Sequence, residues 1–143
     1  MGLEYLVDYT VIGILLLMSI TAVAVAIERI NFYKKVNPEN YDTIELLELD
    51  LTKRLYIIAT IGSNAPYVGL LGTVIGIMFT FYAMGIEAGV EVSVIMKGLA
   101  LALKATAAGL FSAIPAIILY NILLRKVNEL LLIKEAEIAR KKF

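Results

Sequence analysis

Long runs of uncharged residues dominate this chain. No charged residue occurs in Tyr9–Ile27 or in Leu55–Ile86, and Gly98–Leu124 holds a single charge, Lys104. A helix rises about 1.5 Å per residue, so the first run spans about 28 Å, close to the thickness of the hydrocarbon core of a bilayer. The other two runs are longer than a bilayer needs. The pattern therefore predicts an all-α membrane protein with three transmembrane helices, of which the second and third project beyond the membrane or tilt.

Small and polar residues interrupt the second run in a regular way. They follow one another at alternating spacings of four and three, which places them in one stripe along one side of a helix. This stripe consists of Gly62, Pro66, Gly69, Thr73, Gly76 and Thr80. The third run repeats the same spacing with Gly98, Ala102, Ala105, Gly109, Ser112 and Ala116, and Thr106 lies at the edge of that stripe.

Two interpretations of the stripes stay open at this point. Small residues let membrane helices approach closely, because lipid offers no hydrophobic drive for their association. The same stripes can also form the wall of a polar or partner-filled lumen, with Thr73 and Thr106 supplying hydroxyl groups. Pro66 lies near the cytoplasmic end of its run, where a proline either begins the buried part of a helix or forms a hinge.

Lys104 is the ionisable residue that lies deepest in a predicted span, which makes it a functional candidate. It points away from the small-residue stripe, so we favour snorkelling to the outer interface or an ion pair with Glu87 or Glu91. No Asp or Glu lies inside any predicted span. If this chain helps protons to cross a membrane, a partner has to bring the titrating group.

The positions of lysine and arginine predict the orientation of the spans. Apart from Lys97 and Lys104, all of the 13 Lys and Arg residues lie between the first two runs or after the third. Those two segments are expected in the cytoplasm and the N-terminus outside. The predicted division is 1–8 outside, 9–27 first span, 28–54 cytoplasmic loop, 55–86 cytoplasmic extension and second span, 87–97 outside link, 98–124 third span, and 125–143 cytoplasmic helix.

The predicted cytoplasmic segments also show helical signals. Asn37 and Pro38 form a helix start, with asparagine as the cap and proline at the first helical position. After the third run, apolar residues keep a helical spacing. We therefore expect the third helix to continue as one amphipathic helix to about Arg140 and to pack against partners.

The composition excludes several function classes. The chain has no Cys and no His, so disulfides, most zinc sites and Ser-His or Cys-His catalytic pairs are excluded. Its 13 acidic and 13 basic residues balance, which gives no indication of nucleic-acid binding. The stretch before Tyr9 lacks a basic region, so no cleaved signal peptide is predicted. We expect no enzymatic activity, no metal and no cofactor.

Two sequence motifs together resemble a known family. The stretches "APYVGLLGTVIGI" and "GLALALKATAAGLFSAIPAIILYN" are similar to the signature of the ExbB/TolQ/MotA proton-channel family, most closely its ExbB branch. The resemblance implies a pentameric ring in the bacterial inner membrane, with a periplasmic N-terminus and with the second and third spans lining a central pore. Thr73 and Thr106 match the pore-lining threonines of the family, and Pro115 matches its A-I-P-A proline.

The resemblance also implies partners and an activity. A dimer of a single-span, ExbD-like subunit would occupy the pore and carry the proton on a membrane aspartate. Proton flow would then energise a TonB-like protein for uptake across the outer membrane. Two features depart from the family pattern, because Leu101 stands where a glutamate is common and the cytoplasmic loop is short. A TolQ-like role in the envelope and a membrane scaffold without transport are the alternatives.

Overall fold

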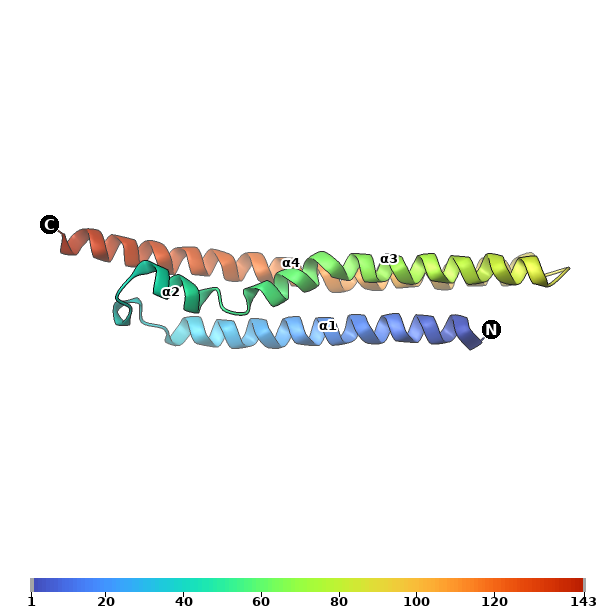
Figure 1. The fold of residues 1–143 in the computed structure, drawn as a ribbon, viewed down its shortest axis with the longest axis horizontal. Coiled ribbons are helices and arrows are strands. Elements are labelled where there is room, and N and C mark those ends of the chain that lie inside the picture. The colour runs from blue at the N-terminus through green and yellow to red at the C-terminus, as the bar shows by residue number, and fades with distance from the viewer. Residues whose placement is uncertain (1, 143) are drawn as a thin grey trace.

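The structure is a computed structural model that describes residues 2–142. Figure 1 shows an elongated bundle of three long helices, with a short helical segment at one end. The elements in chain order are α1 (Gly2–Lys35), η1 (Pro38–Asn40), α2 (Ile44–Leu51), α3 (Leu55–Ile86) and α4 (Val92–Lys141). No strand occurs within residues 2–142, and α1, α3 and α4 are long and apolar enough to cross a membrane. The prediction of an all-α protein with three membrane-spanning helices is confirmed.

Helix α1 is longer than the uncharged run that predicted it. The run ends at Ile27, whereas the helix continues without interruption to Lys35. Charged residues mark the point where a helix leaves hydrocarbon, but they do not end its backbone hydrogen bonding. The last turn carries Lys34 and Lys35, whose charges favour the carboxyl end of a helix.

The helix start at Asn37 is confirmed, but the helix that follows is short. The Asn37 side chain accepts a hydrogen bond from the backbone N–H of Glu39 at 3.1 Å, and Pro38 opens η1, which ends at Asn40. A second cap then begins α2, where the Thr43 side chain accepts from the backbone N–H of Leu46 at 3.3 Å. Two capped helices thus replace the single one that the sequence suggested.

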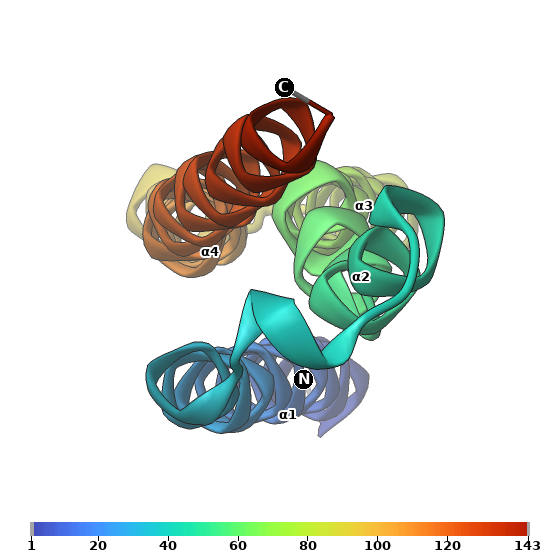
Figure 2. The same cartoon turned by 90° about the vertical axis from the view of Figure 1, so that its left-hand side faces the viewer.

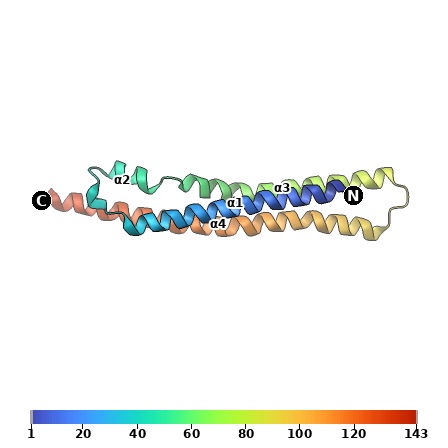
Figure 3. The ribbon, with the colours of Figure 1, turned by 90° about the horizontal axis from the view of Figure 1, so that it is seen from below.

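Helices α3 and α4 form a long antiparallel hairpin. Figure 3 shows that its closed end extends beyond the N-terminus of α1. The link contains Gly89 with a φ of +92°, a conformation that glycine adopts without strain. Beyond the hairpin partner, α4 continues as one helix to Lys141. The prediction that the third helix continues as one helix to about Arg140 is therefore confirmed.

The core lies between the three long helices, which form a triangle when viewed along the bundle (Figure 2). One cluster of buried residues surrounds α2 and includes Leu47, Leu51 and Leu123. A second cluster lies further along the bundle, where Leu15 of α1 packs with small residues such as Ala65. Because those neighbours are small, α1 settles into the groove between α3 and α4.

Candidate functional site

Helices α3 and α4 come into backbone contact at two glycines that face each other. A Cβ atom added to Gly69 would lie 2.9 Å from the Cα of Gly109 and 2.6 Å from the carbonyl oxygen of Ala105. A Cβ on Gly109 would meet the carbonyl oxygen of Ala65 at 2.8 Å. Backbone packs directly on backbone here, and only glycine permits that separation.

The contact continues along both helices, and we call it the seam. A Cβ on Gly62 would lie 2.9 Å from the Ile117 side chain, and one on Gly76 would lie 2.9 Å from Ala102. Gly98 of α4 leaves room for Thr80 of α3. The seam comprises Gly62, Gly69, Thr73, Gly76 and Thr80 of α3, with Gly98, Ala102, Ala105, Gly109 and Ala116 of α4. The two predicted stripes thus pack on each other within one chain.

Two predicted stripe residues lie at the margin of the seam. Pro66 and Ser112 are half-buried. Pro66 lies in the interior of α3, well after the helix begins at Leu55. Nearby, the Asn64 side chain donates a hydrogen bond to the carbonyl oxygen of Thr60 at 2.8 Å. Pro66 itself has no N–H to donate, so the carbonyl oxygen of Gly62, one turn earlier, lacks its usual helical donor.

Two hydroxyl groups meet in the middle of the seam. The Thr73 hydroxyl of α3 and the Thr106 hydroxyl of α4 are hydrogen-bonded to each other. The Thr73 oxygen also lies 2.8 Å from the carbonyl oxygen of Ala102 on the facing helix. A hydroxyl has one hydrogen to donate. When Thr73 donates to that carbonyl, Thr106 donates to Thr73.

The hydrogen bonds of these two hydroxyls can run in either of two donor-to-acceptor directions. Thr73 is 7% exposed, whereas Thr106 is half-buried and lies nearer the surface of the hairpin. If Thr106 donates outward to another acceptor, Thr73 can donate to Thr106 instead. Threonine hydroxyls pass hydrogen bonds along but carry no charge at physiological pH. The pair can therefore guide a proton but needs an acid group from elsewhere.

Lys104 forms its ion pair with a residue that sequence reasoning placed outside the spans. Its ammonium group lies 3.9 Å from the carboxylate of Asp8 on α1. The predicted ion pair of Lys104 with Glu87 or Glu91 was therefore wrong. They are near Lys104 along the chain, but α1 occupies the groove between α3 and α4 and brings Asp8 to the same level. The Lys104 side chain is 62% exposed, and that of Asp8 is 9% exposed.

Asp8 also borders a small cavity between the three long helices. The cavity holds about 20 Å³, room for about one water molecule. Its lining includes Glu4 and Asp8 of α1, Gly72 of α3 and Leu101 of α4. Leu101, which stands where the resemblance expects a glutamate, thus lies beside two carboxylates carried by α1.

Sequence reasoning missed two residues of this region. Asp8 was counted as part of the tail, although it shares a helix face with the buried Val11 and Leu15. That shared face was the available signal. Gly72 was left out of the stripe, yet a Cβ there would meet both Ala105 and Val11. Gly72 faces both α1 and α4, whereas the four-three spacing of small residues describes a contact with one helix.

Comparison with known proteins identifies the family. The sequence signature of the MotA/TolQ/ExbB proton channel family matches residues 24–136, a range that contains the whole seam. The chain belongs to the MotA/TolQ/ExbB proton channel family. Within the matched range, Thr73 and Thr106 form a hydrogen bond between the two helices of the hairpin.

Relatives named ExbB match this family member over nearly its full length. The biopolymer transport protein ExbB of Aquifex aeolicus is 58% identical over 94% of this chain and 90% of its own. A putative biopolymer transport protein ExbB-like 2 of Helicobacter pylori is 52% identical over 92% of this chain and 87% of its own. The Tol-Pal system protein TolQ of Haemophilus influenzae is 46% identical, but over 54% of this chain and 34% of its own. The chain is ExbB-like.

Proposed function

We propose that this chain is the ring-forming, ExbB-like inner-membrane subunit of a motor driven by the proton motive force. With an ExbD-like subunit it energises a TonB-like protein for uptake across the outer membrane. The observation that carries the proposal is the hydrogen-bonded pair Thr73–Thr106 on the α3–α4 seam, within a chain that is 58% identical to a protein named ExbB.

The lysine and arginine bias sets the proposed orientation. Residues 1–8 contain no Lys or Arg, and the link 87–97 contains only Lys97. The segments 28–54 and 125–143 hold the rest, except for Lys104. Positive residues accumulate on the cytoplasmic side of bacterial membrane proteins. We place the N-terminus in the periplasm and the free end of α4 in the cytoplasm.

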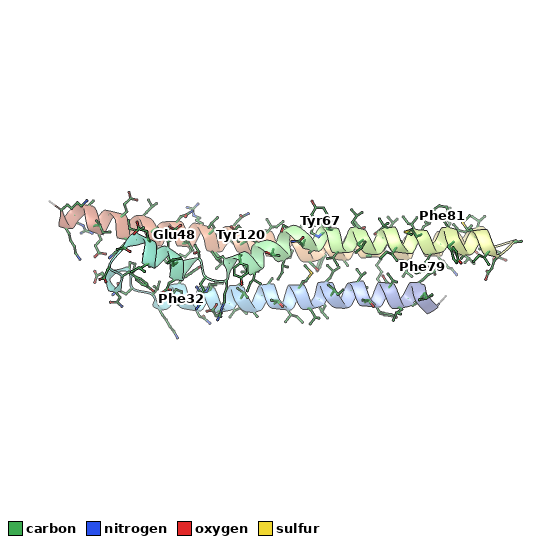
Figure 4. The ribbon with its side chains drawn as sticks, viewed as in Figure 1. Phe32, Glu48, Tyr67, Phe79, Phe81 and Tyr120 are labelled. Carbon is green, nitrogen blue, oxygen red and sulfur yellow. The ribbon has the colours of Figure 1, made fainter. Side chains whose placement is uncertain are left out.

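The apolar surface supports assembly into an oligomer. Helix α3 has 32 residues, about 48 Å of helix against a hydrocarbon core of about 30 Å. Near the closed end of the hairpin, Met78, Phe81 and Ile86 are each more than half exposed. Figure 4 shows Phe79 and Phe81 on opposite sides of α3 at this end. Neighbouring copies in a ring would cover the apolar surface that a single bilayer leaves in water.

The partner follows from what the seam lacks. The seam residues carry hydroxyls but no titratable group, and the nearby Asp8 of α1 is paired with Lys104, so the acid on the proposed proton path comes from another chain. An ExbD-like single-span subunit would bring an aspartate into the ring. In this arrangement Thr73 and Thr106 order the hydrogen bonds around that carboxylate, and the proton resides on the partner.

Hydroxyl removal tests this proposal directly. Thr73→Val and Thr106→Val keep the side-chain shape and remove the hydroxyls. A hydrogen bond between membrane helices stabilises by about 0.6 kcal/mol, so the oligomer should still assemble. We expect TonB-dependent uptake of an iron complex to fall at least about tenfold, which corresponds to about 1.4 kcal/mol. Thr73→Ser and Thr106→Ser, which keep the hydroxyl, serve as matched controls.

The contrary outcomes are equally clear. Normal uptake by both valine variants would remove the hydroxyls from the mechanism. A native mass corresponding to a monomer, with no single-span subunit recovered, would favour a membrane scaffold without transport. The TolQ protein of Haemophilus influenzae, which would support a TolQ-like role, matches 54% of this chain. The partner that co-purifies separates the two systems.

A further inference from the structure

Helix α2 presents an acidic face with two uncovered leucines. Leu47 and Leu51 point inward and are fully buried. On the other side, Leu46 and Leu49 are 49% and 68% exposed. The exposed carboxylates Glu45 and Glu48 flank these leucines, and the whole segment 36–52 contains five acidic residues and no Lys or Arg. We call Glu45, Leu46, Glu48 and Leu49 the α2 outer face.

Helix α4 presents a basic and apolar stripe at the same end of the bundle. Its inward residues Leu123 and Val127 are buried. Helical geometry at about 100° per residue gathers six outward positions in an arc of about 120°. This α4 stripe consists of Ile122, Arg125, Lys126, Glu129, Leu132 and Ile133. Its aliphatic members are each more than half exposed. Between 125 and 142 the chain carries six basic and three acidic residues.

The two surfaces lie at one level but point away from each other. Leu47 and Leu51 share a buried cluster with Leu123 and Val127, so the inner sides of α2 and α4 already face each other. Figure 2 shows α4 and α2 on opposite sides of the end view. A single copy therefore cannot bring its own α2 outer face onto its own α4 stripe. A neighbouring copy at the same depth in the membrane can.

We propose that the α2 outer face of one copy docks on the α4 stripe of the next copy. Carboxylates flank the leucines of the α2 outer face, and Arg125 and Lys126, which pair with Glu129 within one copy, flank the aliphatic residues of the α4 stripe. Such opposite charges select one partner and one register. Two different faces at one level form a heterologous contact, and the bilayer orients every copy alike. The contact therefore repeats around an axis normal to the membrane. This inference rests on the proposed ring assembly and names the surfaces that hold it together outside the lipid.

The charge of α2 also argues against lipid as the occupant of its outer face. The cytoplasmic leaflet carries anionic lipids, which attract basic segments and repel acidic ones. A helix that lies on such a surface presents lysines and arginines beside its apolar residues. Glu45 and Glu48 stand in those flanking positions, so the exposed leucines fit a basic protein surface better than a membrane.

Disulfide cross-linking tests the contact in the full-length chain, which has no native cysteine. The double variant Leu46→Cys/Ile133→Cys is oxidised in native membranes and analysed by denaturing electrophoresis. Heterologous docking predicts a ladder of dimers and higher species. Each single-cysteine variant should give no species beyond the dimer. If native mass shows an oligomer and the ladder is absent, this inference is wrong while the proposed function stands. A monomeric native mass overturns both.

Charge reversal supplies the second test. Glu45→Lys/Glu48→Lys should lower the rate of ladder formation about tenfold at low ionic strength, and adding Arg125→Glu/Lys126→Glu should restore it. Glu39→Lys/Asp42→Lys, which reverses two exposed charges outside the α2 outer face, is the matched control. An unchanged rate in the α2 variant overturns the docking. So does protection of the Leu49→Cys variant from a water-soluble maleimide in a monomeric preparation, since lipid would then cover that face.

Discussion

The glycine seam makes the most quantitative prediction. In Gly69→Ala the new Cβ would lie 2.6 Å from the Ala105 carbonyl oxygen and 2.9 Å from the Cα of Gly109. Ordinary contact begins at 3.4 Å, so α3 and α4 must separate by about 0.8 Å, since both atoms belong to backbone that cannot rotate away. Overpacking of this kind costs about 1–3 kcal/mol.

The separation also affects the hydroxyl pair. Thr73 lies one turn from Gly69, and its hydroxyl is 2.8 Å from the Ala102 carbonyl oxygen. An opening of about 0.8 Å would stretch this distance to about 3.6 Å, too long for a hydrogen bond. Gly69→Ala should therefore destabilise the hairpin and also break the hydrogen bond from Thr73 to the Ala102 carbonyl oxygen.

Equilibrium unfolding of the purified chain in mixed micelles, followed by circular dichroism, measures the effect. Gly13→Ala on α1 is the matched control, because a Cβ there meets nothing within 4 Å. That control should gain up to about 1 kcal/mol from helix propensity. Gly62→Ala should fall between the two, since its Cβ meets the end of the Ile117 side chain, which can move. If Gly69→Ala is as stable as Gly13→Ala, the close backbone contact does not exist.

Three further predictions concern the polar residues around the bundle and use the same unfolding assay. Lys104→Met should destabilise by up to about 1 kcal/mol, because it leaves the Asp8 carboxylate unpaired but the 3.9 Å ion pair includes a 62% exposed lysine. Asp8→Asn should cost less than Lys104→Met, because the exposed Lys104 can snorkel to water; equal effects would show that the pair does not hold α1. Tyr33→Phe should destabilise by about 1–3 kcal/mol, because the buried hydroxyl that donates to the Leu51 carbonyl oxygen at the end of α2 is lost; an unchanged stability would show that water replaces it. Arg54→Gly should leave the stability unchanged or raise it by up to about 1 kcal/mol. Arg54 has a φ of 68°, which glycine adopts with less strain, and its half-exposed ion pair with Glu28 at 3.5 Å is weak. A clear loss of stability would mean that this ion pair outweighs the backbone strain.

The local pattern of the chain was sufficient for its membrane class and its hairpin. Uncharged runs predicted three spanning helices, because burying a charge in hydrocarbon is costly at any point of a fold. The four-three spacing of small residues predicted an interface along α3 and α4, because helix geometry alone places such residues on one side. Asn37 and Pro38 likewise predicted a helix start through local hydrogen bonding.

The sequence by itself determined which faces of α3 and α4 have side chains small enough for close approach, because helical periodicity is a local property. Only the tertiary structure decided what those faces meet. It joined Thr73 to Thr106 across the hairpin and paired Lys104 with Asp8 instead of with Glu87 or Glu91. These partners are far apart along the chain, and their contact depends on where α1 settles in the groove between α3 and α4. Periodicity within one helix carries no information about the position of a neighbouring helix along the bundle axis or about its orientation. Only the packing of the whole bundle determines these two quantities.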